Sequence, residues 1–182
     1  MLEELTNIPP QQIPVGDEKT MSIFRSTEAF GVTPEQIGSA VGTYGIPECG
    51  TQFVRQMIQD VQPKNFSQVV RVSGYSHGTD VWLNNAQDLI RSGTVKLEEA
   101  ISTRDDVMNY LIEHGVRPLT AFKVMENVRK GKGLEKGGLN NKAELDAAHV
   151  PQWFIDSCLK IGYLFPRAHA VAYVCLLYTS PS

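Results

Sequence analysis

The chain has 182 residues, and 42% of them are hydrophobic, which is enough to build the core of one ordinary folded domain. This composition excludes a chain that is disordered throughout. The formal net charge of −3 and the pI of about 5.8 lack the basic excess typical of nucleic-acid-binding domains, so any basic site must be local. The cysteines lack zinc-ligand spacing and no signal peptide or membrane-spanning run is found, which predicts a cytoplasmic protein with reduced thiols and no membrane partner.

Two short helices are expected near the start of the chain. Asp17 can cap a segment that carries the apolar residues Met21 and Phe24. Residues 33–36, Thr-Pro-Glu-Gln, combine an N-cap, a proline at the first helical position and a glutamine three residues after the cap, which is typical of a capping box.

Residues 51–61 carry apolar side chains at intervals of three and four, which predicts a helix with one buried face. The residues expected on that face are Phe53, Val54, Met57, Ile58 and Val61. A shorter helix is expected at 65–72. Residues 73–79, Ser-Gly-Tyr-Ser-His-Gly-Thr, are expected to form a turn broken by glycines.

Two further helices are expected in the middle of the chain. Asp80 can open a helix that Gly93 ends, with Leu83, Ala86, Leu89 and Ile90 on its buried face. Thr103 is followed by acidic residues in a first turn, and Gly115 ends that helix. This second helix should bury Val107 and Leu111, and its paired carboxylates, Asp105 and Asp106, are best explained as a cap.

Pro118 restarts a helix that should end at Gly131 and bury Ala121, Phe122, Met125 and Val128. Residues 131–141 hold four glycines and are expected to form a mobile loop. Further helices are expected at 142–149, at 151–161 and from Pro166 onward. The only β-branched run, Val69–Val72, lies inside a helical pattern, so the predicted fold class is all-α.

The most informative stretch is Phe165–Val174, which places polar residues on the expected opening of a buried helix. Pro166 suits the first helical position, and a helix N-terminus beside Arg167 and His169 would attract an anion such as phosphate. His169 and Tyr173 are four residues apart and therefore share a face. The alternative is a core histidine with satisfied hydrogen bonds beside a packed tyrosine.

Two other groups of residues could bind an anion. Arg129, Lys130 and Lys132 lie at the end of the helix that begins at Pro118, where cations also stabilise the helix dipole without any ligand. Hydroxyl and basic side chains surround the glycines of residues 71–79, where they could bind an anion or simply cap a helix. A catalytic Ser-His pair is a poor explanation, because no third partner or nucleophile-elbow pattern lies nearby.

Three segments together carry a resemblance to a known family. They are SGYSHGTDVWLNNAQDLI (Ser73–Ile90), NVRKGKGL (Asn127–Leu134) and YLFPRAHAVAYV (Tyr163–Val174). In order and approximate spacing they resemble the fingers region of the PolC-type DNA polymerase III of low-GC Gram-positive bacteria. The resemblance runs from about Ile8 to Val174.

This resemblance implies an irregular multi-helix fingers subdomain that is a fragment of a larger polymerase. The expected parts are a first helical part at 1–130, the glycine-rich loop at 131–141, a second helical part at 142–174 and a non-native tail at 175–182. The tail is so interpreted because the resemblance stops after Val174.

The resemblance also implies function: the parent would be a replicative DNA-directed DNA polymerase, and this part would bind the triphosphate of the incoming dNTP. The residues it implies at the nucleotide are Arg71, Ser73, His77, Arg129, Lys130, Lys132, Arg167, His169 and Tyr173, with Arg129 as the bidentate phosphate contact. The implied partners are dNTP, primer-template DNA, the palm domain of the same polymerase and other replisome components. The intact enzyme would use Mg²⁺ held by palm aspartates that are expected to precede Met1, so this chain should contain no catalytic residue or metal ligand and be inactive alone.

The sequence alone is also compatible with two other classes of function. A non-catalytic helical nucleic-acid-binding module would bind DNA with a steep salt dependence. A helical protein-interaction adaptor would leave its basic residues pointing in unrelated directions. Convergence of Arg129, Lys132, Arg167 and His169 on one concave surface would argue against the adaptor.

Overall fold

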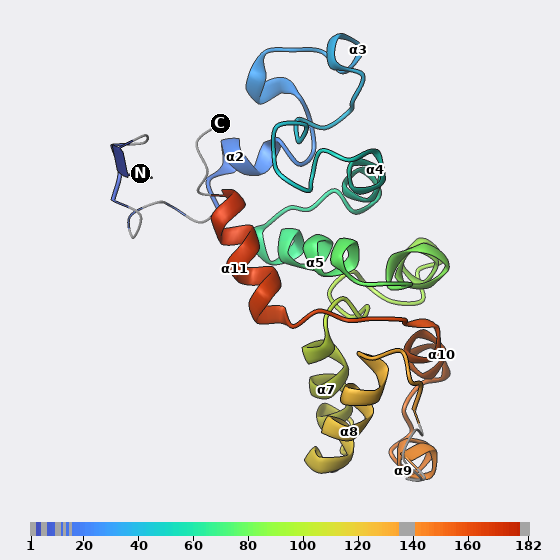
Figure 1. The fold of residues 1–182 in the computed structure, drawn as a ribbon. Coiled ribbons are helices and arrows are strands. Elements are labelled where there is room, and N and C mark those ends of the chain that lie inside the picture. Colours follow the sequence, from blue (N-terminus) through green and yellow to red (C-terminus); the bar gives the residue numbers. More distant parts are fainter. Residues whose placement is uncertain are drawn as a thin grey trace. The chain divides into compact units, whose positions relative to one another are not determined.

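The computed structural model describes residues 3–4, 7–9, 12, 14, 16–134 and 141–178, with side chains as far as Cys175. These residues form helices joined by turns (Figure 1) and contain no β-strand, only one isolated bridge between Thr79 and Tyr163. The predicted all-α class is confirmed. None of the helices in this part of the chain has the length and apolarity needed to cross a bilayer. Residues 135–140 of the loop expected at 131–141, and residues 179–182 of the tail expected at 175–182, lie outside the described residues.

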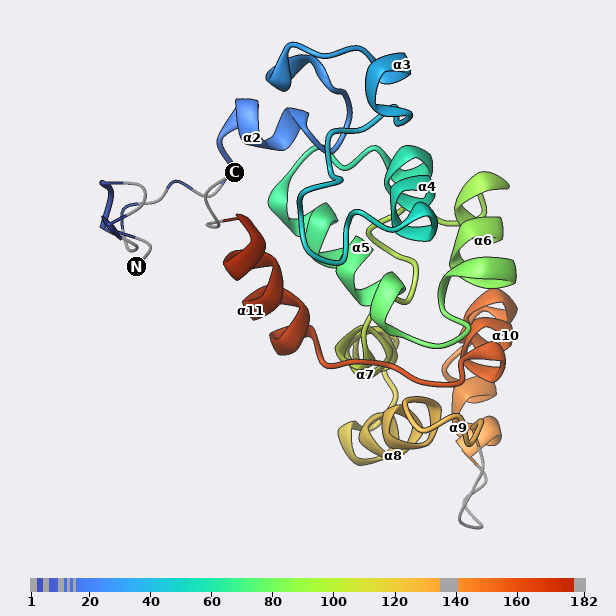
Figure 2. The same ribbon diagram turned by 45° about the horizontal axis from the view of Figure 1, so that its top comes forward.

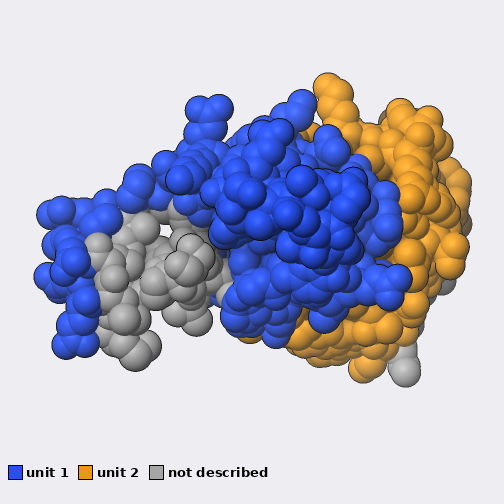
Figure 3. Space-filling view, turned by 90° about the horizontal axis from the view of Figure 1, so that it is seen from above, with its two compact units in different colours: residues 1–72, 171–182 blue, residues 73–170 orange. Residues whose placement is uncertain are grey.

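The chain divides into two compact units, residues 1–72 with 171–182, and residues 73–170 (Figure 3). The divisions fall inside α5 (Phe66–His77) and α11 (Arg167–Tyr178). These positions differ from the glycine-rich segment at 131–141, whose role as a boundary stays a prediction.

Most described helices of the first unit begin at a residue whose side chain caps them, and the 3-10 helix at 28–30 is the exception. The helices are α2 (Glu18–Ser22), η2 (Glu28–Phe30), α3 (Pro34–Ile37) and α4 (Gln52–Val61). The side chain of Asp17 accepts a hydrogen bond from a backbone N–H three residues later at 2.7 Å, and Thr51 caps α4 in the same way at 3.3 Å. Thr33 and Gln36 form the predicted capping box. Short side chains thus satisfy donors that a helix start leaves unpaired.

The core of the first unit confirms most of the face expected for α4. Val54, Met57 and Ile58 are buried. Phe53 is 43% exposed, so the prediction that it is buried was wrong. The buried residues recur at three and four positions as one narrow stripe, and Phe53 lies at its edge, facing water.

The second unit holds six whole helices of the described chain around a core of aliphatic side chains with the aromatic residues Tyr75, Trp82 and Phe154. They are η3 (Trp82–Ala86), α6 (Gln87–Arg91), α7 (Arg104–Glu113), α8 (Pro118–Val128), α9 (Asn141–Ala147) and α10 (Gln152–Lys160). Helices α7 and α8 lie side by side in Figures 1 and 2 and pack through Val107, Leu111, Ala121 and Val124, all fully buried. Phe122 was expected on this face but is 45% exposed, because the buried stripe of α8 runs through Thr120, Ala121, Val124, Met125 and Val128.

Residues 73–79 do not form the expected turn, because α5 continues as a helix to His77. Gly74 does not break it. A Cβ at Gly74 would lie 2.7 Å from the carbonyl oxygen of Ser102, so the glycine allows another backbone to approach the helix.

The helix expected from Asp80 to Gly93 is interrupted, and only Gln87–Arg91 form a regular α-helix, α6. In η3 the backbone leaves helical geometry, with Asn84 at φ +57°, and Leu83 is 53% exposed instead of buried. The cause is tertiary: buried Asn85 donates from Nδ2 to the carbonyls of Asp80 at 3.0 Å and Ser157 at 3.2 Å, which anchors the segment to α10.

Helix α11 begins at Arg167, directly after Pro166. Ala170 and Val174 are buried, whereas His169 is exposed and Val171 is 37% exposed. The expectation of a buried helix opening was therefore wrong, because only one narrow stripe of α11 faces the core.

The segment that positions the candidate site joins α10 to α11, and we call residues 161–166 the connecting segment. Its backbone bonds to three separate places in the second unit. Tyr163 O accepts from Thr79 N at 3.0 Å, Phe165 O from Arg104 N at 3.0 Å, and Leu164 N donates to Arg129 O at 3.2 Å. The end of α5, the start of α7 and the end of α8 therefore meet along one extended stretch of chain.

Candidate functional site

The basic turn at the end of α8 is shaped by a glycine. Lys132 N donates to Asn127 O at 2.9 Å, the bond from the residue after the αL position back over the last turn that is typical of a Schellman ending. Gly131 has φ +65°, and a Cβ there would lie 2.5 Å from the carbonyl oxygen of Gly162. Both the αL backbone and the close approach to the connecting segment require glycine.

Glu126 contacts two of the three cations of this turn. Arg129 bonds both carboxylate oxygens, through Nε to Oε1 and through Nη2 to Oε2, the latter at 2.9 Å. Lys130 Nζ lies 2.8 Å from Oε2. Hydrogen bonds from Arg129 and then Lys130 lower the pKa of Glu126 to about 2, so this carboxylate is ionised at neutral pH. Lys132 is exposed.

Aromatic rings continue the site from the connecting segment to the end of α5. The rings of Phe165 and His169 stack with centroids 5.1 Å apart, and His77 meets the edges of both, at 5.4 and 5.7 Å. Tyr163 packs against Phe165 at 5.2 Å. Sequence spacing suggested two histidines in separate motifs, and the structure brings them together.

The position of the hydrogen on His77 follows from its partner. Nδ1 lies 2.7 Å from the carbonyl oxygen of Ser73 one helical turn earlier. Because a carbonyl oxygen can only accept, Nδ1 carries the hydrogen, and Nε2 is the acceptor of the neutral ring. Ser73 itself is buried.

Arg167 is bound to the start of α7. Its guanidinium pairs with Asp106 Oδ1, and its backbone N–H donates to Asp105 Oδ2 at 2.6 Å. Asp106 is only 8% exposed, and its other oxygen accepts from the backbone and hydroxyl groups of Ser102 and Thr103. The predicted capping role is confirmed for Asp106, which forms a capping box with Thr103, whereas Asp105 bonds the backbone at the start of α11.

Arg71 and Tyr173, the remaining predicted residues, belong to the first unit. Arg71 is half-buried on α5. Partial burial raises the pKa of the Tyr173 phenol, as does the carboxylate of Glu48, with which it shares a hydrogen bond. Glu48 has φ +62°, so it holds a left-handed backbone next to this contact.

Sequence reasoning missed three residues of the site, Glu126, Tyr163 and Phe165. Glu126 could have been found, because an acidic residue three and four positions before two cations on a helix predicts ion pairs. Nothing in the pattern of the connecting segment indicated that its rings would meet His77, a contact between residues far apart in sequence.

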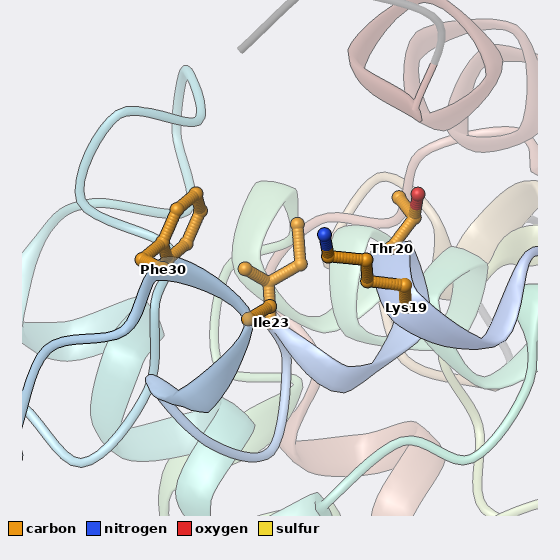
Figure 4. A pocket seen from close by; sticks show the side chains of 5 residues that line it. Lys19, Thr20, Ile23 and Phe30 are labelled. Atoms are coloured by element: carbon orange, nitrogen blue, oxygen red, sulfur yellow. The ribbon is translucent and has the colours of Figure 1, made fainter.

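The first unit contains a hollow of about 460 Å³ between α2 and η2 (Figure 4). Lys19, Thr20, Ile23, Ala29 and Phe30 line it, and none of them was predicted as a site residue. No group of three or more histidine, cysteine or acidic residues in the part of the chain that is described could hold a metal ion.

Comparison with known protein families shows which family this chain belongs to. Residues 1–148 match the family model for the bacterial DNA polymerase III alpha subunit finger domain. The chain belongs to this family. The finger domain identity agrees with the three motifs, two of which lie within the matched residues.

Individual relatives agree that the chain is related to DNA polymerase III. The chain is 54% identical over 178 residues to the DNA polymerase III PolC-type of Caldanaerobacter subterraneus subsp. tengcongensis and 55% identical over 178 residues to that of Thermotoga maritima, in each case over 98% of this chain. It is 55% identical to the Bacillus subtilis protein of the same name over 174 residues, 96% of this chain. It spans only 12 to 13% of the length of these curated relatives.

Proposed function

We propose that this chain is the part of a replicative DNA-directed DNA polymerase that binds and orients the triphosphate of the incoming dNTP. The observation that carries the proposal is the meeting of the basic turn of α8 with the connecting segment, through Leu164 N and Arg129 O at 3.2 Å. That contact places the cations of one motif beside the segment that leads to the ring cluster of the other two motifs. A cytoplasmic location follows from this role.

Arg129 can bind phosphate without leaving Glu126. A guanidinium has five N–H donors in a planar fork, and Glu126 occupies the edge formed by Nε and Nη2. The edge formed by Nη1 and Nη2 can still donate two parallel hydrogen bonds to phosphate oxygens. Lys130 and Lys132 would add charge, and His77 and His169 would lie along the same segment.

The role of Arg167 in this proposal is more constrained. Its side chain is 43% exposed, but the guanidinium already pairs with a buried carboxylate, that of Asp106. A phosphate would have to share it with that carboxylate. Substitution of Arg167 would also leave Asp106 without its ionic partner, so a loss of activity would mix two causes.

The metal chemistry of polymerisation is assigned to another part of the parent. Nucleotidyl transfer uses divalent cations, here proposed to be Mg²⁺, held by carboxylates. The acidic residues that bond Arg129 or Arg167 are Glu126, Asp105 and Asp106, and each is engaged with an arginine or a helix start. They do not fit a metal-binding group, and no step through a metal is assigned to them. Primer-template DNA, the palm domain and other replisome components are the partners that the proposal requires.

Steady-state kinetics of single-nucleotide incorporation test the proposal. The enzyme is a full-length polymerase carrying this segment, for instance the Bacillus subtilis relative with its aligned residues exchanged for this chain. Loss of a charge-assisted bidentate contact is expected to lower kcat/KM for dNTP about 10- to 100-fold in Arg129→Ala, with primer-template affinity unchanged. The matched control is Arg117→Ala, which removes an exposed arginine that also pairs with a carboxylate, Glu144, in the same unit.

Unchanged kcat and KM in Arg129→Ala would contradict the assignment. The alternative of a non-catalytic nucleic-acid-binding module predicts a different pattern, in which Arg129→Ala weakens primer-template binding and lessens its salt dependence. An equal loss in the Arg117→Ala control would show that the effect is a general one of removing surface charge.

A further inference from the structure

Glu126 is an unexpected residue to find in a site for a polyanion. Its carboxylate is ionised, its side chain is 23% exposed, and it contacts Arg129, the first candidate for phosphate binding. By charge alone it should repel a triphosphate and lower the affinity of the basic turn. A geometric benefit would have to outweigh that repulsion.

The hydrogen bonds of Glu126 supply such a benefit. Both of its oxygens bond Arg129, and Lys130 Nζ lies 2.8 Å from Oε2 and so gives the carboxylate a second anchor. A free arginine samples many rotamers, since each of its aliphatic torsions has three staggered wells. Bonded on its Nε and Nη2 edge, Arg129 keeps one orientation, and the edge formed by Nη1 and Nη2 remains to donate.

We infer that Glu126 is a positioning residue that orients the Arg129 fork before the nucleotide arrives, with Lys130 anchoring Glu126. The inference rests on the proposed function, because it concerns how Arg129 meets the triphosphate. It goes beyond that function by assigning a role to an acidic residue, one whose charge opposes the ligand. The ordering of Arg129 takes place before binding, so its entropic cost is not subtracted from nucleotide affinity.

Glu126→Gln in the same full-length polymerase tests this inference, because the two explanations predict changes of opposite sign. Glutamine has nearly the same shape but only one acceptor oxygen and no charge. If Glu126 positions Arg129, kcat/KM for dNTP falls about tenfold, since only a fraction of the Arg129 rotamers remains competent. If Glu126 only adds negative charge, its removal raises kcat/KM through a lower KM.

A double-mutant cycle separates positioning from a general structural role. In the Arg129→Ala background, Glu126→Gln is expected to cause no further loss, because the residue it positions is absent. A full additional tenfold loss in that background would overturn the inference. The matched control is Glu144→Gln, which removes a carboxylate that likewise holds an arginine fork and has its pKa lowered to about 2, but lies outside the proposed site. This control is expected to retain kcat/KM.

The outcomes distinguish the inference from the function on which it rests. If Arg129→Ala lowers kcat/KM and Glu126→Gln leaves it unchanged or raises it, the inference fails and the proposed function stands. If Arg129→Ala itself has no effect, the proposed function fails first.

Discussion

Substitution of Gly131 by alanine tests the contact between the basic turn and the connecting segment. Gly131 has φ +65°, a conformation that costs an L-residue free energy. The added Cβ would also lie 2.5 Å from the carbonyl oxygen of Gly162 and 3.2 Å from its carbonyl carbon and Cα. All three are backbone atoms, so no side-chain rotation can relieve the contact.

The expected loss of stability has two parts. The left-handed conformation costs about 1 to 2 kcal/mol for alanine. Overpacking against a fixed backbone adds about 1 to 3 kcal/mol, because the connecting segment must move aside. We therefore expect the free energy of unfolding of the second unit to fall by about 3 kcal/mol in Gly131→Ala.

Urea unfolding followed by tryptophan fluorescence measures this loss of stability in the second unit. The chain has two tryptophans, Trp82 and Trp153, and both belong to residues 73–170. With a urea m-value of about 2 kcal/mol per molar, the midpoint should fall by about 1.5 M. Gly115→Ala is the matched control: it has φ +85° after α7 and no atom within 4 Å of the added Cβ. Its midpoint should fall by only about half as much, from backbone strain alone.

Equal shifts in Gly131→Ala and Gly115→Ala would contradict this expectation. They would mean that the carbonyl of Gly162 moves away at no cost and that the connecting segment is not held against the end of α8. The anchoring of Arg129 through Leu164 N would then lose its support.

Three further predictions concern charge and burial. Asp106→Asn should lower the free energy of unfolding by about 3 to 5 kcal/mol in the same urea assay, since it removes a buried, fully bonded carboxylate. The control Asp88→Asn changes an exposed aspartate and should alter the free energy of unfolding by no more than about 0.5 kcal/mol. Equal losses in the two variants would contradict this prediction. Hydrogen bonds to Arg117 lower the pKa of Glu144 from 4.5 to about 2. The stability that this pair adds to the folded state is therefore fully present above pH 4.5 and is lost as the pH falls from 4.5 toward 2. Glu144→Gln should flatten the dependence of stability on pH in that window, and parallel curves would count against the pairing. Burial raises the pKa of Cys49 to about 11 and also raises the pKa of Cys158. At pH 7 both thiols should therefore react with a thiol reagent only when urea unfolds the chain. Rapid labelling of either cysteine in the folded chain would disprove its burial.

The candidate site was only partly predictable from sequence. The basic turn, Arg167 and the histidines were found as separate motifs, each with a structural alternative. Spacing also placed Asp106 at a helix start, and the structure confirms its capping role. The pairing of Asp106 with Arg167 joins residues 61 positions apart, and no local pattern indicates a contact of that kind.

Local patterns in the sequence were enough to predict most of the helices and many of their ends. Those features depend on residues within four positions of one another, such as the caps at Thr33 and Thr51 and the stop at Gly115, so local rules suffice. These local rules fail where contacts between residues far apart in the sequence override them. Buried Asn85 interrupts an expected helix because its amide bonds α10, and Gly74 permits a close approach where it was expected to break α5. Backbone hydrogen bonds from the connecting segment bring the motifs together. Because nearly every residue offers the same backbone N–H and C=O groups, the sequence does not indicate which groups will pair, and the packing of the helices determines it.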